Sequence, residues 1–175
     1  MRALVIVDVQ KDFVTGALGT VEAQAMLPRL LEKLRGFEGG VWLTLDTHGE
    51  DYLETQEGRY LPVAHCVKGT EGWQLEDEVG RIARERDAAI VEKPTFGSEK
   101  LVEELRSLYE EGRLEGVELC GLCTEICVVS NALLLKAAMP ELPISVDAAC
   151  CAGVTPEKHR AALEVMRSCQ IDVRN

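Results

Sequence analysis

The feature that most constrains the fold of this chain is the regular alternation of short apolar runs with longer amphipathic runs. The apolar runs are rich in β-branched residues and nearly unbroken, as is typical of strands that are buried on both faces of a sheet. The amphipathic runs place leucine and valine at helical spacing. Strands that alternate with helices predict a parallel sheet covered by helices on both faces, which is the α/β class.

The chain divides into predicted elements of ordinary length. The predicted strands are Ala3–Val9, Val41–Leu45, Ala88–Val91, Val117–Cys120, Ile144–Val146 and Ile171–Val173. The predicted helices are Ala25–Leu34, Gln74–Arg84, Ser98–Glu110, Glu125–Met139 and Thr155–Ser168. Only residues 46–73 depart from this rhythm, in a polar, turn-rich segment with two of the three histidines. Long loops in compact domains are often functional. We expect one domain over residues 1–175.

Charge and composition argue against several classes of partner. The net charge of −11 disfavours nucleic acid and anionic membranes as partners. No apolar run approaches the roughly 20 residues that span a bilayer, and the N-terminal residues lack the pattern of a signal peptide. The seven cysteines, an odd number, lie mostly in apolar runs, which favours reduced thiols over a disulfide framework. We therefore expect a cytoplasmic protein.

One cysteine lies where a predicted strand gives way to a predicted helix. Thr124 is a suitable N-cap residue, so Cys127 would lie three residues inside the helix. A thiol in that position meets the positive end of the helix dipole, which favours the thiolate. The segment suggests a nucleophile. Because the helix is mostly apolar, Cys127 taken alone could equally be a small core residue.

Charged side chains follow the neighbouring predicted strands. Asp8, Asp46 and Lys93 lie at or just beyond the ends of their strands, and ligands of parallel α/β sheets bind beyond the carboxyl ends of the strands. A carboxylate that accepts the thiol proton and a cation that stabilises charged groups suit nucleophilic catalysis. Singly, Asp8 could cap a helix and Lys93 could be solvated. Their joint placement with Cys127 favours a site.

A second candidate site lies within residues 46–73. Asp46 and His48 would point to the same side of an extended segment, and Glu57 and His65 follow them. Carboxylate and imidazole are ligands of zinc, iron and manganese. The alternative is a polar surface loop with two incidental histidines. Other acidic residues of this loop could replace Glu57, namely Glu50, Asp51 and Glu54.

The cysteine spacing offers a rival interpretation. Cys120, Cys123 and Cys127 form a C-x2-C-x3-C pattern, which is compatible with an iron–sulfur cluster or structural zinc. We do not favour it, because Cys120 lies inside a strand run and a fourth ligand at a recognisable spacing is missing. A redox disulfide between Cys120 and Cys123 rests on spacing alone, and a redox role of Cys150 or Cys151 stays open.

The order and spacing of these motifs resemble those of the isochorismatase-like cysteine hydrolases, most of all the nicotinamidases. The match covers nearly the whole chain. Its motifs are Asp8-Val9-Gln10-Lys11-Asp12-Phe13, Asp46-Thr47-His48, Pro62 to His65, Gly69-Thr70-Glu71-Gly72-Trp73, Lys93-Pro94-Thr95-Phe96-Gly97-Ser98, Gly121-Leu122-Cys123-Thr124-Glu125-Ile126-Cys127-Val128, and Val146-Asp147-Ala148-Ala149 with His159 and Ala162-Leu163.

The resemblance implies a three-layer α/β/α fold around a six-stranded parallel sheet, and a catalytic triad of Asp8, Lys93 and Cys127. It also implies a cis peptide between Leu122 and Cys123. The backbone N–H groups of Cys123 and Cys127 would then form an oxyanion hole.

The resemblance further implies one divalent metal ion beside the triad, zinc ahead of iron or manganese, bound to the ring nitrogen of the substrate. Asp46, His48 and His65 match the ligands of that site. The fourth position departs from the commonest pattern, because Glu57 stands where many members have histidine, and Glu54 is its competitor. Isochorismatases proper generally lack this ligand set.

The activity that the resemblance implies is hydrolysis of nicotinamide to nicotinate and ammonia through a thioester on Cys127, in NAD salvage. Phe13 and Phe96 would pack against the substrate ring, or else belong to the core. A related hydrolase acting on another small amide, a carbamoyl compound or isochorismate is the alternative. A non-catalytic redox-sensing or binding protein is a third. We expect a small-molecule amide substrate and a homo-oligomer.

Overall fold

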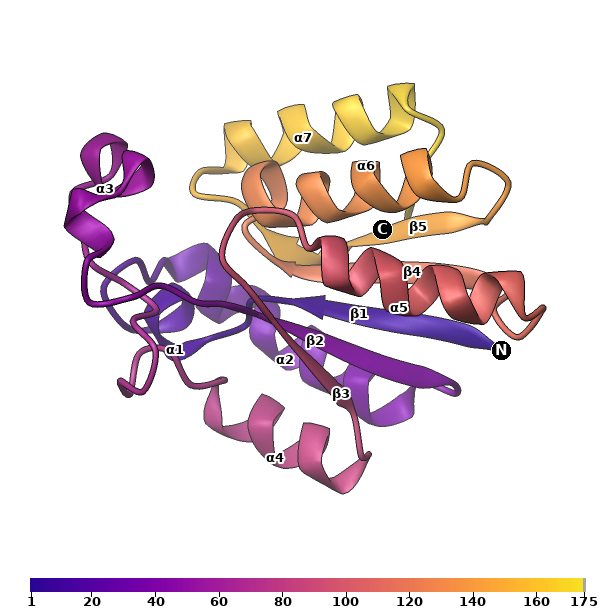
Figure 1. Cartoon of the computed structure of the whole chain (residues 1–175), viewed down its shortest axis with the longest axis horizontal. Helices are drawn as coiled ribbons and strands as arrows, with labels where there is room; N and C mark the ends of the chain where they lie inside the picture. The colour runs from indigo at the N-terminus through magenta and orange to yellow at the C-terminus, as the bar shows by residue number, and fades with distance from the viewer. Residues whose placement is uncertain (175) are drawn as a thin grey trace.

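A six-stranded, wholly parallel sheet forms the centre of the computed structural model, which describes residues 1–174 (Figure 1). The strand order is β3-β2-β1-β4-β5-β6. This arrangement confirms the predicted fold class. The strands are β1 (Arg2–Val7), β2 (Gly40–Asp46), β3 (Ala89–Lys93), β4 (Gly116–Leu122), β5 (Ile144–Ala152) and β6 (Asp172–Arg174).

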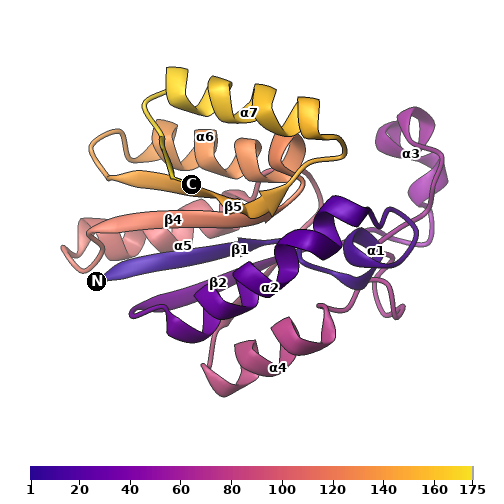
Figure 2. The same ribbon diagram turned by 180° about the vertical axis from the view of Figure 1, so that it is seen from behind.

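Helices cover both faces of the sheet. They are α1 (Lys11–Val14), α2 (Val21–Gly36), α3 (Gln56–Tyr60), α4 (Asp77–Glu85), α5 (Glu99–Glu110), α6 (Val129–Ala138) and α7 (Pro156–Ser168), with a 3₁₀ turn η1 (Tyr52–Glu54) and a π-helical turn η2 (Thr124–Val128). Helices α2 and α4 pack together on one face, and α5, α6 and α7 pack side by side on the other (Figures 1 and 2). The short helix α3 projects beyond the strand ends in both views.

Local sequence accounts for where the long helices begin. Thr20, Ser98 and Thr155 cap α2, α5 and α7, because each hydroxyl accepts a hydrogen bond from a backbone N–H of the first turn. The central strand β1 pairs with β2 and β4 and is covered on both faces, so residues 3–7 are wholly buried. The unbroken apolar run of β1 reflects this double burial.

The start of the helix after β4 differs from the prediction. We expected Thr124 to cap an α-helix that begins at Glu125, but Cys123 is the N-cap and Thr124 is the first residue of η2. The Thr124 hydroxyl lies 2.7 Å from Nδ1 of His159 on α7, and this partner draws it away from a capping role. The α-helix proper begins only at Val129.

Further differences concern the end of one strand and three short helical elements. Strand β5 continues to Ala152, beyond the predicted end at Val146. The turn-rich segment 46–73 contains η1 and α3, and α1 follows β1; none of these short elements was predicted. Such elements are stabilised by contacts with the rest of the molecule more than by helix propensity.

The strand order reverses between β1 and β4. The chain leaves β1 toward β2 and leaves β4 toward β5, with the connecting helices on opposite faces of the sheet. Such a switch point is where open α/β sheets bind ligands. Gly121 permits the close approach of the two strands here, since its φ is 122° and a Cβ would lie 2.1 Å from the Val7 carbonyl oxygen. Over the part of the chain that the structure describes, there is no helix with the length and apolarity to cross a membrane.

Candidate active site

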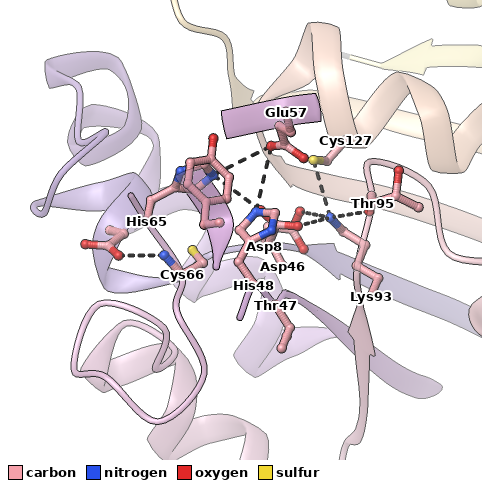
Figure 3. A network of polar contacts seen from close by, with 12 residues as sticks. Asp8, Asp46, Thr47, His48, Glu57, His65, Cys66, Lys93, Thr95 and Cys127 are labelled. Carbon is pink, nitrogen blue, oxygen red and sulfur yellow. Dashed lines mark hydrogen bonds and ion pairs between the residues drawn. The ribbon is translucent and has the colours of Figure 1, made fainter. Parts of the chain in front are cut away.

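The ends of β1, β3 and β4 bring a carboxylate, an ammonium and a thiol together (Figure 3). The Lys93 Nζ atom lies 2.7 Å from Asp8 Oδ2 and 3.4 Å from Cys127 Sγ. All three residues are buried: Lys93 is 1% exposed, Asp8 0% and Cys127 4%. The sequence prediction that these residues converge is therefore matched by their positions. Groups in this arrangement can pass a proton between sulfur and carboxylate under a fixed positive charge.

The Asp8 carboxylate is held in place from β2. The Thr44 hydroxyl donates to Asp8 Oδ1 at 2.6 Å and accepts from the Asp8 backbone N–H at 3.2 Å. Asp8 has a φ of 48°, in the left-handed region that aspartate adopts more readily than most residues. Thr44 is wholly buried beside it. Sequence reasoning missed Thr44, because a threonine inside a strand is ordinary and its partner is set by strand pairing.

The Lys93 ammonium lies among several acceptors. Besides Asp8 and Cys127, it donates to the Thr95 carbonyl oxygen at 3.0 Å and to Asp46 Oδ1 at 3.2 Å. Burial alone would lower the pKa of Lys93, but the surrounding Asp8, Cys127 and Asp46 groups outweigh it and raise that pKa. Lys93 is therefore a permanent cation at the centre of the site.

Burial raises the pKa values of the two groups on either side of Lys93, Asp8 and Cys127. Burial, opposed by the Lys93 ammonium, raises the pKa of the Asp8 carboxyl. Burial and the Asp8 charge raise the pKa of the Cys127 thiol well above its usual value. Burial thus opposes the thiolate that the helix start was expected to favour. A base must remove the thiol proton, and Asp8 is the base at hand.

The turn that carries Cys127 is fixed by buried polar side chains. Asn131 Nδ2 donates to the carbonyl oxygens of Cys127 at 2.8 Å and Phe96 at 3.1 Å, and its Oδ1 accepts from Ser98 N at 3.0 Å. One amide thereby joins α6 to the loop between β3 and α5. A buried asparagine in an otherwise apolar helix was the signal that could have revealed it.

Four potential metal ligands gather beside the triad. One side-chain atom from each of Asp46, His48, Glu57 and His65 lies within 4.8 Å of all the others. Asp46 Oδ2 is 3.0 Å from His48 Nε2 and 3.6 Å from His65 Nε2. Glu57 Oε1 is 3.8 Å and 3.9 Å from the same two nitrogens. Helix α3 turns Glu57 inward, whereas Glu54 is exposed.

The donor atoms of this cluster suit a divalent cation. His65 Nδ1 lies 2.8 Å from the Val63 carbonyl oxygen, which can only accept, so the proton is on Nδ1 and Nε2 is left free to bind. Two imidazoles with two carboxylates are ligands that zinc, iron and manganese accept.

The charges of the cluster are strongly coupled. Burial favours the neutral form of Asp46, but the His48 hydrogen bond, the nearby His65 ring and the Lys93 charge lower its pKa overall. Burial and the Asp46 charge raise the pKa of Glu57. Burial opposes protonation of His65, yet the nearby Asp46 carboxylate, 3.6 Å from its Nε2, raises that pKa. A bound cation would relieve the repulsion between the two carboxylates.

A buried amide fixes Asp46. Gln10 Nε2 donates to the carbonyl oxygens of Asp46 at 2.9 Å and Trp73 at 2.7 Å, and its Oε1 accepts from Asp46 N at 2.8 Å. Gln10 thereby joins the segment after β1 to the end of β2 and to the loop before α4. The Asp8–Phe13 motif contained this residue, but its partners are not visible in the sequence.

The other predicted site residues, Phe13, Phe96 and Cys123, differ from one another in how deeply they are buried. Phe13 is buried, and its ring packs edge-on against His65 with 5.5 Å between ring centroids. Phe96 is exposed and lines a cavity that Lys93 also borders. Cys123 is partly buried, and the Leu122–Cys123 peptide is cis, as the resemblance implied.

The remaining thiols show no pairing. All seven cysteines, which lie within the described residues 1–174, are free, so the rival disulfide between Cys120 and Cys123 is not formed. Burial raises the pKa values of Cys150 and Cys123 to about 12.

Known proteins resemble this chain over its whole length. The nicotinamidase/pyrazinamidase of Mycobacterium tuberculosis is 30% identical, with 99% of this chain and 98% of that protein aligned. The nicotinamidase/pyrazinamidase structure from Bacillus subtilis has a TM-score of 0.87 at 25% identity and 99% coverage of both chains. A pyrazinamidase of Pyrococcus horikoshii, solved in complex with zinc, has a TM-score of 0.79 at 28% identity, covering 98% of this chain and 97% of that one.

A family model supports the same assignment. The model of the isochorismatase domain matches residues 2–175, which is nearly all of the sequence. The matched range contains every group of the candidate site. This chain therefore belongs to the isochorismatase domain family.

Proposed function

We propose that this protein is a nicotinamidase, an amidohydrolase that converts nicotinamide to nicotinate and ammonia with Cys127 as its nucleophile. The observation that carries the proposal is that one cation contacts both the triad and the ligand cluster. The Lys93 ammonium lies 2.7 Å from Asp8 of the triad and 3.2 Å from Asp46 of the cluster. A thiol triad thus borders a cluster of metal ligands. The named activities of the similar proteins support the same reaction.

The first half of the reaction forms a thioester. Asp8 accepts the Cys127 thiol proton while the Lys93 ammonium stabilises both negative charges. The thiolate adds to the carboxamide carbon, and the carbonyl electron pair moves to oxygen, where the N–H groups of Cys123 and Cys127 stabilise it. The carbonyl re-forms, the C–N bond breaks, and Asp8 returns the proton to the departing ammonia.

The second half releases the acid. Asp8 removes a proton from water, the hydroxide adds to the thioester carbon, and the C–S bond then breaks to leave the Cys127 thiolate, which regains the proton from Asp8. Phe13 and Phe96 contribute apolar surface to the ring.

We assign the metal-ligand role to Asp46, His48, Glu57 and His65, with zinc as the first candidate ion. A divalent ion bound there would supply an electrophilic anchor for the ring nitrogen. The zinc complex of the Pyrococcus horikoshii pyrazinamidase supports zinc.

Ammonia release from nicotinamide tests the proposal. We expect wild-type protein to release ammonia and nicotinate in equal amounts, and Cys127→Ala to lose at least about 10³-fold in kcat/KM. Cys169→Ala, at the end of α7, is the matched control and should keep wild-type activity. A wild-type enzyme that hydrolyses other small amides but not nicotinamide would overturn the substrate assignment. Full activity of Cys127→Ala would overturn the assignment of Cys127 as the nucleophile.

Removal of the metal provides a separate test of the ligand cluster. We expect dialysis against a strong chelator to lower both the activity and the melting temperature, since a ligand that binds only the folded state stabilises it. Addition of zinc should restore both. Metal analysis of the dialysed protein is the control. Full activity without any bound divalent ion would contradict the assigned role.

A further inference from the structure

Tyr52 is a deeply buried residue within a segment, residues 52–60, that is mostly exposed or only partly buried. It is 1% exposed, whereas its neighbours Leu53 and Tyr60 are 55% and 85% exposed. The segment of η1 and α3 is polar and projects from the body of the protein (Figure 1). A large aromatic side chain that turns inward from such a segment is fixed by specific contacts, and none of the proposed catalytic steps uses it.

The Tyr52 ring packs against both imidazoles of the ligand cluster. Its centroid lies 4.7 Å from that of His48, with 58° between the planes, and 4.9 Å from that of His65, with 75° between the planes. The two imidazole centroids are themselves 4.9 Å apart. Three rings in mutual contact restrict one another's rotation.

Tyr52 is also tied to the helix that carries Glu57. Its hydroxyl donates to the Leu61 carbonyl oxygen at 2.9 Å, which closes the loop around α3. Its own carbonyl oxygen accepts from the Thr55 hydroxyl at 2.6 Å. Gly58 packs so closely that a Cβ there would lie 2.1 Å from the Tyr52 carbonyl oxygen. The backbone of Tyr52 therefore fixes α3, while its ring fixes the histidines.

We propose that Tyr52 is a positioning residue for the metal site: it holds His48, His65 and the Glu57 helix in the arrangement that binds a divalent cation. The inference rests on the ligand role proposed above. Ligands that are already ordered lose less conformational freedom on binding, so their affinity for the ion is higher. The Tyr52 hydroxyl is engaged with Leu61, so its role is to orient the ligands.

Zinc affinity of the full-length apo protein, measured by competition with a chromophoric chelator, tests the inference. We expect Tyr52→Leu to bind zinc about 10–100-fold more weakly than wild type, the range that changes behind metal ligands typically produce. Tyr52→Phe keeps the ring contacts and loses only the hydrogen bond to Leu61. Its zinc affinity should therefore lie between those of wild type and Tyr52→Leu. Tyr60→Leu changes an exposed tyrosine of the same segment and should bind zinc as wild type does.

A second readout separates positioning from general destabilisation. The visible absorption of bound cobalt reports ligand geometry, and it should change in Tyr52→Leu and remain unchanged in Tyr60→Leu. Circular dichroism establishes that each variant is folded. Should Tyr52→Leu not fold, Tyr52→Met replaces it with the same expectation, because the flexible methionine side chain fills irregular space.

The outcomes distinguish this inference from the proposed function. Wild-type zinc affinity and an unchanged cobalt spectrum in a folded Tyr52→Leu or Tyr52→Met protein would overturn the role of Tyr52. Wild-type protein that binds no divalent metal would overturn both the ligand assignment and this inference. Zinc binding that depends on Tyr52, in a protein without amidase activity, would support this inference and overturn the proposed function.

Discussion

At the scale of single residues, the site depends on the charge of Lys93. This lysine is buried among Asp8, Asp46 and the Cys127 thiol, and each of these groups raises its pKa. A buried cation of this kind stabilises the carboxylates around it, which would otherwise lie unpaired in a dry environment. Lys93 therefore contributes to both the stability and the proposed chemistry.

Replacement of this charge should be costly. We expect Lys93→Met, which matches the lysine side chain as far as Cε but lacks the ammonium, to lower the free energy of unfolding by about 3–5 kcal/mol, because it leaves buried carboxylates without their partner. Activity should fall at least about 10³-fold. Urea unfolding and the ammonia assay measure the two effects. Lys100→Met, a change on the exposed surface of α5, is the control. Wild-type stability of Lys93→Met would contradict the ion-pair argument.

The residues of the site could be predicted to different extents. Asp8, Lys93 and Cys127 were predictable because they follow strands, and parallel strands end at one edge. Glu57 was preferred to Glu54 from the resemblance alone, because its inward direction depends on a helix of five residues that propensity does not reveal. Tyr52 escaped notice, because its ring contacts join segments that only the fold brings together.

At the scale of elements, the turn η2 departs from regular α-helix and is held by side chains from distant parts of the chain. Thr124 contacts His159 on α7, and Asn131 joins α6 to the loop after β3. The sequence predicted a strand followed by a helix here, which is correct in outline. The π-helical turn between them could not be predicted, since it depends on partners far away in the chain.

Substitution of Asn131 tests whether its hydrogen bonds hold the turn η2 in place. We expect Asn131→Ala to destabilise the protein by about 2–4 kcal/mol, because it leaves buried backbone groups of Ser98, Phe96 and Cys127 without their partner. We also expect a lower kcat with a smaller change in KM, as the nucleophile loses its fixed position. Ala137→Ser, on the exposed side of α6, is the control in both assays. An unchanged kcat would show that the turn keeps its geometry without Asn131.

At the scale of the whole molecule, a charged cluster joins α2 to β4 and β5, the strands that this helix covers. The Lys33 ammonium contacts Glu118 on β4 and lies 2.7 Å from Asp147 on β5. Arg2 and Arg174 also pair with Glu118, so both ends of the described chain meet at β4. Burial favours the neutral form of Asp147, but Lys33 outweighs it and lowers the pKa of Asp147.

This cluster predicts an acid-dependent loss of stability. Because the pKa of Asp147 is lower in the folded than in the unfolded chain, its contribution is complete above the unfolded value of 3.8 and is lost as the pH falls through the folded value. We expect the free energy of unfolding of Asp147→Asn to fall less steeply than that of wild type between about pH 5 and pH 3. Asp172→Asn, on the exposed part of β6, is the control. Identical slopes for wild type and Asp147→Asn would contradict the prediction.

The contact of Lys93 with Asp46 has a consequence for the interpretation of mutagenesis. Asp46 is a metal-ligand candidate, yet its Oδ1 accepts from the same ammonium that faces Cys127. A substitution of Asp46 therefore changes both the metal site and the surroundings of the Lys93 ammonium. A loss of activity in such a variant cannot be attributed to loss of the ion alone. Within the described residues 1–174, His48 and Glu57 do not contact Lys93, so variants of these two residues report on the ion alone.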